Sequence, residues 1–124
     1  MDDTRQSCEF PRAELYFGSI LVAHVASVFC SDDTWYGVFE PEAAEQVESS
    51  PVLRRLYEFI KFCVDWNDRH YRNPGDPPDA DEFDAFSDVI DSDSWFARTP
   101  QGDTLLIDHA PVFQPEGAVS WRPR

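Results

Sequence analysis

Basic residues are scarce in this chain of 124 residues: ten Lys and Arg stand against 24 Asp and Glu, and the formal net charge at pH 7 is −14. Proteins that bind nucleic acid or an anionic membrane need clustered basic side chains, so we expect neither as a direct partner. The same charge favours solubility and would speed the encounter with a protein that has a basic surface. The simpler alternative is that the acids only keep the protein soluble.

Cysteine is also rare. Cys8, Cys30 and Cys63 are far apart, and no two of them have the Cys-x-x-Cys spacing. An odd, widely spaced set is typical of buried thiols in a reducing compartment rather than of a disulfide framework. The apolar run 15–30 follows a net acidic segment, contains His24, and is shorter than the roughly 20 residues that a membrane-spanning helix needs. We therefore expect a cytoplasmic protein.

Motifs that carry a known chemistry are missing as well. The five glycines are scattered, so there is no Gly-rich phosphate loop, and Gly-x-Ser-x-Gly, His-Glu-x-x-His and Ser-x-x-Lys do not occur. His24, His70 and His109 have no metal-ligand spacing with each other or with the cysteines. Asp108 and His109 are neighbours on a predicted strand, which would point their side chains to opposite faces. We expect no cofactor and no metal, and we lean towards a protein that is not an enzyme.

The acid-rich stretch 73–86, NPGDPPDADEFDAF, is the first place to test for a calcium loop. An EF-hand loop needs acids or Asn at its positions 1, 3 and 5 and Gly at position 6, and a count from Asp79 fails at positions 5 and 6. Asp79 and Glu82 instead have the spacing of a capping box, with Asp81 in the first turn of a short helix over 79–91. Local helix capping therefore explains most of the acid density.

Two regions predict β-hairpins. Both alternating faces of 16–29 are apolar, which predicts one long strand, bent or broken at Gly18, and the turn signal SDDT then leads into a second strand, WYGVFE. Further along, 95–98 and 104–108 flank the turn TPQGD. The sequence AVSW near the end could add a last short strand.

The clearest predicted element is a helix from about 51 to 72. Ser50 is a good N-cap, Pro51 suits the first helical position, and an apolar face opposes a face of oppositely charged pairs. The resulting order is β-β-α-α-β-β. We therefore predict a single α+β domain in which an antiparallel sheet of four or five strands carries two helices on one face. The ends, 1–10 and 119–124, are expected to be loose.

Aromatic residues supply the candidates for a protein-binding surface. Phe62 and Trp66 lie four residues apart at the border of the polar face of the long helix, beside arginines, a combination that is enriched in binding hot spots. Trp35 and Tyr36 offer a second aromatic pair on the second strand. Packing of these rings against a loop or the sheet is the alternative. The acidic residues assigned to the same function are Asp79, Asp81, Glu82 and Asp84.

A pocket is the competing kind of site. Asn67 and His70 fall on the apolar side of the long helix near its C-terminal end, where polar groups need partners or mark a pocket. Together with His24 they would line a pocket between the helix and the sheet. The alternative is that the helix leaves the core in its last two turns, which would leave both side chains half exposed.

Two functional hypotheses follow. Neither 13–53, with seven acids, nor 73–97, with eight, contains a Lys or Arg, so the acids can form one or two negative surfaces. We favour a non-enzymatic protein-binding module that attracts a basic protein, by analogy in charge and size with immunity, inhibitor and adaptor proteins. The alternative is a small-molecule-binding protein or hydrolytic enzyme that uses the pocket near His24, Asn67 and His70.

Overall fold

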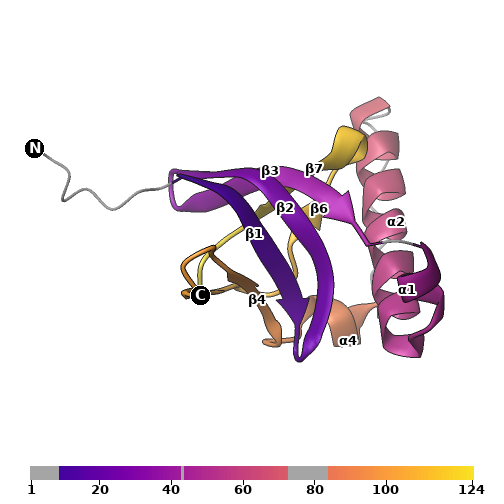
Figure 1. Cartoon of the computed structure of the whole chain (residues 1–124). Coiled ribbons are helices and arrows are strands. Elements are labelled where there is room, and N and C mark those ends of the chain that lie inside the picture. Colours follow the sequence, from indigo (N-terminus) through magenta and orange to yellow (C-terminus); the bar gives the residue numbers. More distant parts are fainter. Residues whose placement is uncertain (1–8, 43, 73–83) are drawn as a thin grey trace, which may run out of the picture.

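The computed structural model describes residues 9–42, 44–72 and 84–124 (Figure 1). Seven strands form one antiparallel sheet in the spatial order β5-β4-β1-β2-β3-β7-β6. The strands are β1 (Glu9–Phe17), β2 (Ile20–Ser31), β3 (Thr34–Pro41), β4 (Trp95–Arg98), β5 (Thr104–Leu106), β6 (Val112–Phe113) and β7 (Ala118–Trp121). The helices are α1 (Ala44–Glu48), α2 (Pro51–Arg72) and α4 (Ser87–Ile90), with a 3-10 turn η1 at Pro115–Gly117. The long helix α2 stands beside the sheet, and α1 lies next to its N-terminal half (Figure 1).

The segment 16–29 is broken at Gly18, one of the two possibilities predicted from the sequence, and it does not form one long strand. Gly18 has a φ of +62°, and the turn there sends the chain back so that Phe17 pairs with Ile20. Glycine adopts this backbone conformation without the steric cost that a side chain would add. An apolar run on both faces is therefore divided between two paired strands, β1 and β2, rather than forming one strand buried on both sides.

The predicted fold class is wrong in its counts: the described residues form seven strands and three α-helices, not four or five strands with two helices. The strand β1 begins at Glu9, in a polar segment that does not alternate cleanly, and β6 has only two residues. Both were therefore missed. The extra helix is α1, five residues long, in a polar connection for which the sequence predicts at most a turn of helix.

Other elements agree with the sequence. The helix α2 spans the predicted range, and the hydroxyl of Ser50 accepts the N–H of Leu53 at 3.2 Å, as an N-cap should. The SDDT turn joins β2 to β3, with Asp32 and Asp33 at positive φ, and β4 pairs with β5 as predicted. Of the predicted helix over 79–91, residues 79–83 lie outside the described part of the chain, and α4 occupies part of the remainder.

One face of the sheet packs against α2 and forms the core. Phe113 lies at its centre: its ring is 5.3 Å from Phe39 of β3, 6.1 Å from Phe59 of α2 and 6.4 Å from Trp95 of β4, between ring centroids. The buried side chains that α2 contributes are Leu53, Leu56, Phe59, Ile60 and Cys63. Burial of rings of this size is a large part of what holds a domain of this length together.

The sheet bends until the chain that follows β7 reaches the edge strand β5. The N–H of Asp108 donates to the carbonyl of Arg122 at 2.8 Å, and the N–H of Arg124 donates to that of Leu106 at 3.0 Å. These bonds join the chain after β5 to the chain after β7. The C-terminal end, which the sequence predicted to be loose from 119 onwards, is thus partly a strand and partly fixed by this pairing.

Replacing Gly37 by alanine will destabilise the fold, because a Cβ there would overlap Cγ1 of Val25 and lie 3.1 Å from the carbonyl oxygen of Ala26. Overpacking of this kind costs about 1–3 kcal/mol. Urea unfolding of Gly37→Ala should show this loss of unfolding free energy. Val38→Ala, the next residue, whose side chain is exposed, is the control and should lose less than about 1 kcal/mol. Equal stability of Gly37→Ala and the wild type would contradict the packing.

Candidate functional site

The outer face of the sheet, which points away from α2, carries exposed apolar side chains. Phe29, Tyr36, Val38 and Val112 expose between 38% and 48% of their surface, and we call these four residues the apolar patch. The strand register brings them together. Phe29 pairs with Tyr36, and their rings stack at 5.2 Å. Tyr36 and Val112 both pair with Ser120, which places them on either side of β7.

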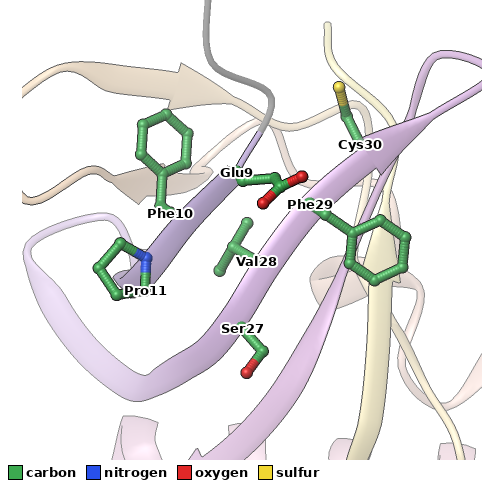
Figure 2. A pocket seen from close by; sticks show the side chains of 7 residues that line it. All are labelled: Glu9, Phe10, Pro11, Ser27, Val28, Phe29 and Cys30. Carbon is green, nitrogen blue, oxygen red and sulfur yellow. The ribbon is translucent and has the colours of Figure 1, made fainter.

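A β-bulge hollows the sheet next to this patch. Ser27 has a φ of +54°, and the register of β2 against β3 shifts between Ala26 and Phe29. Pro11 lies opposite the bulge on β1; it has no N–H to donate, so the pairing is interrupted on both strands. The result is a hollow of about 700 Å³, and Figure 2 shows the side chains that line it. It is lined by Glu9, Phe10, Pro11, Ser27, Val28, Phe29 and Cys30.

Within the hollow the two phenylalanines have different environments. Figure 2 shows the side chains of Phe10 and Phe29 pointing away from each other, and the Glu9 side chain extending from β1 towards β2. Phe10 stacks on Trp35 at 5.7 Å, whereas Phe29 belongs to the apolar patch. Glu9 pairs with Phe29 in the register, so a carboxylate borders the patch at this point.

Carboxylates predominate around the apolar patch, and we call them the acidic rim. Its members are Glu9, which pairs with Phe29, Glu40, which follows Val38 by two residues on β3, and Asp32 and Asp33 in the turn between β2 and β3. The basic groups nearby are Arg12, which donates to Glu40 at 2.9 Å, and Arg122, which follows β7. The rim is therefore net negative.

His24 also lies on the outer face, and not between the sheet and α2 as the pocket hypothesis requires. Its Nε2 is 3.9 Å from Glu14 and its Nδ1 is 3.7 Å from Glu42, both measured to Oε2. The hydroxyl of Tyr57, on α2, donates to the carbonyl of Val22 at 2.6 Å and accepts the N–H of Glu42 at 2.7 Å, which fixes the backbone of Glu42. A hollow of about 340 Å³ lies on the other side of His24, lined by Arg12, Ala13, Glu14, His24, Arg98, Thr99, Pro100 and Gly102.

Asn67 lies in a different place. Its amide donates to the carbonyls of Cys63 and Phe113, both at 3.0 Å, so its role is to join α2 to β6. The hollow that it borders, of about 600 Å³, is lined by Tyr71 and the η1 turn and does not include His24. The side chain of His70 lies outside the described residues. The structure therefore does not bring His24 and Asn67 into one pocket.

The aromatic border of the long helix is covered by α4. The ring of Phe62 packs against Phe86 at 5.2 Å, and the guanidinium of Arg55 lies 5.2 Å above the same Phe86 ring. Arg55 also holds Asp88 through two hydrogen bonds, of 2.6 and 3.1 Å. Trp66, one turn further along α2, is half-buried. Arg55 and Phe62 thus meet on Phe86 and attach α4 to α2.

The remaining predicted residues are dispersed. Trp35 turns inward to Phe10, whereas Tyr36 turns outward into the apolar patch, as alternation along a strand requires. Asp84 is exposed, and Asp79, Asp81 and Glu82 lie outside the described residues. The sequence analysis missed Phe29, Val38 and Val112 as surface residues. The alternation of Tyr36 and Val38 was visible, but the bulge that turns Phe29 outward was not.

Two observations bear on metals. Among the described residues, no group of three or more His, Cys, Asp or Glu side chains could hold a metal ion. Asp108 and His109, predicted to point apart, instead contact each other at 2.7 Å, because β5 ends at Leu106 and His109 has a φ of +62°. This pair is exposed to solvent.

Comparison with family models, curated proteins and solved structures finds no match for this chain. No helix in the described part of the chain is long and apolar enough to cross a membrane. Function therefore has to follow from the surface itself.

The attachment of α4 can be tested through Asp88. Its hydrogen bonds to Arg55 lower the pKa of this carboxyl below its ordinary value of 3.8. A lowered pKa means that the contact stabilises the fold above pH 3.8 and is lost as the pH falls through the folded-state pKa. In Arg55→Gln, the pKa of Asp88 measured by NMR titration should rise towards 3.8. Arg54→Gln, on the neighbouring exposed position, is the control and should leave it unchanged. An unshifted Asp88 in Arg55→Gln would contradict the contact.

Proposed function

We propose that this protein is a non-enzymatic, cytoplasmic protein-binding module, comparable to an immunity, inhibitor or adaptor protein, whose partner has a basic surface. The observation that carries the proposal is the apolar patch surrounded by the acidic rim. Contiguous exposed apolar groups with a polar border are typical of interaction sites, and aromatic side chains such as Tyr36 supply much of the energy in them.

The net charge of this protein indicates that the proposed partner is positively charged. A net charge of −14 creates a long-range field that accelerates encounter with a basic protein and repels acidic ones. Such steering weakens with salt, since the screening length falls from about 10 Å at 0.1 M to about 3 Å at 1 M. Binding should therefore depend on ionic strength through the association rate.

The buried thiol of Cys63 supports a cytoplasmic location. Cys63 forms no disulfide, and burial raises the pKa of its thiol to about 12. An inert, buried thiol is what a protein in a reducing compartment can carry without cost. The pocket hypothesis gains no comparable support, because His24 and Asn67 border different hollows.

The test is capture of a partner from an extract of the source organism. We expect the immobilised protein to retain a basic protein at about 50 mM salt and to release it at about 500 mM, where exposed charges are largely screened. Bound proteins are identified by mass spectrometry. Beads that carry an unrelated protein of similar net charge are the control, because they reveal retention by charge alone. Clean beads at both salt concentrations, or identical proteins on the control beads, would contradict the proposal.

A further inference from the structure

We propose that the basic partner docks on the outer face of β2, β3, β7 and β6, with an apolar side chain seated in the hollow beside Phe29 and Lys or Arg side chains facing the acidic rim. This inference rests on the proposed function and names the surface and the chemistry of the contact. It replaces the aromatic border of α2, where Phe62 contacts Phe86, as the place where binding energy is supplied.

The apolar patch lies on β2, β3 and β6, with Ser120 of β7 between its members on β3 and β6. Phe29 on β2 stacks on Tyr36 on β3, Val38 follows on the same strand, and Val112 on β6 completes the row across Ser120. Other exposed apolar residues of the described part, such as Leu106 and Val52, lie on β5 and α2 and do not belong to this row. The patch is thus a local concentration of exposed apolar surface.

The hollow gives this flat surface a place for an anchor. It exists because Ser27 bulges out of β2 and Pro11 cannot donate a hydrogen bond across from it. Bulges re-aim neighbouring side chains, and here Phe29 is turned outward at the border of the hollow. Binding hot spots typically combine such a recess with an aromatic neighbour.

The edges of the sheet are poorly suited to the alternative of strand addition. The edge strand β6 has two residues, it follows Pro111 and precedes Pro115, and the Phe113 carbonyl already accepts from Asn67. At the other edge, the chain after β5 is paired with the chain after β7. Short, proline-flanked and covered edges resist pairing with another chain. The outer face of the sheet is therefore the surface on which a partner can bind.

The charge of the acidic rim indicates which kind of partner can bind the apolar patch. The acidic rim would face itself if two copies of this chain met on the apolar patch, and it would face phosphates if nucleic acid bound there; both arrangements place like charges together. A partner with Lys or Arg around an apolar centre places opposite charges together instead. The complementary occupant is therefore a basic protein surface with an exposed aromatic or aliphatic side chain.

Short peptides test this surface without knowledge of the partner. The probes are acetylated, amidated peptides of sequence KKWKK, KKGKK and EEWEE, titrated into the isotope-labelled full chain and followed by backbone amide shifts. We expect KKWKK to shift amides of β2, β3 and β7 and to bind about tenfold more tightly than KKGKK, which lacks the anchor. EEWEE should not bind.

Two substitutions and a matched control locate the contact. Tyr36→Ser and Phe29→Ser should each weaken KKWKK about tenfold, whereas Leu106→Ser, an equally exposed apolar residue outside the patch, should leave the affinity within about twofold. Circular dichroism and thermal unfolding verify that each variant is folded. Lys61→Ala, on α2, should also have no effect.

Three results would overturn the proposal: shifts that map to α2 and α4, equal binding of KKWKK and KKGKK, or equal binding of KKWKK and EEWEE. A dimer in sedimentation that Tyr36→Ser dissociates would also overturn it, because the patch would then bind a second copy. An experiment can reject this docking surface without rejecting the proposed function. A basic partner that is captured from extract equally by wild type and Tyr36→Ser would keep the function and reject this surface.

Discussion

The backbone pairing between 106–108 and 122–124 is the constraint on which the rest of the structure depends. It joins the edge strand β5 to the chain that follows β7, near the opposite edge of a seven-stranded sheet, so the sheet must bend and one of its faces must enclose a core. The bend explains why a single ring, Phe113, can contact β3, β4 and α2 at once.

The side chains that point inward determine which side chains lie on the outer face of the sheet. Because side chains alternate along a strand, every residue that contributes to the core fixes the outward direction of its neighbours. Gly37 and Phe39 point inward, so Tyr36 and Val38 must point outward. The bulge at Ser27 breaks this alternation once and turns Phe29 to the same side as Tyr36. The apolar patch is thus a product of the same geometry that builds the core.

Sequence reasoning succeeded where the physical signal is local. The helix α2 repeats its apolar face over 22 residues and has its own N-cap, so its range could be predicted before any packing was known. The strands β1 and β6 were not predicted, for the opposite reason. A short or polar strand is stabilised by its neighbours, and those neighbours are distant in sequence.

The candidate site was predicted only in fragments. Tyr36, proposed as a contact residue, is exposed, but its stacking partner Phe29 depends on a register shift that composition does not encode. The placement of His24 and Asn67 in one pocket failed because it assumed which face of β2 would meet the helix. The turn at Gly18 and the register of β1 against β2 set which side chains of β2 point inward.

The strand order has a consequence for how the chain folds as it is made. β1, β2 and β3 are successive hairpins that can form early, but the outer edge of β1 awaits β4 and the outer edge of β3 awaits β7. Both partners come from the last third of the sequence, after α2. The core between them is therefore completed late, and a nascent chain presents two unpaired strand edges until its C-terminal segment emerges. A chain cut short before β7 would keep the outer edge of β3 unpaired, and one cut short before β4 would keep both edges unpaired.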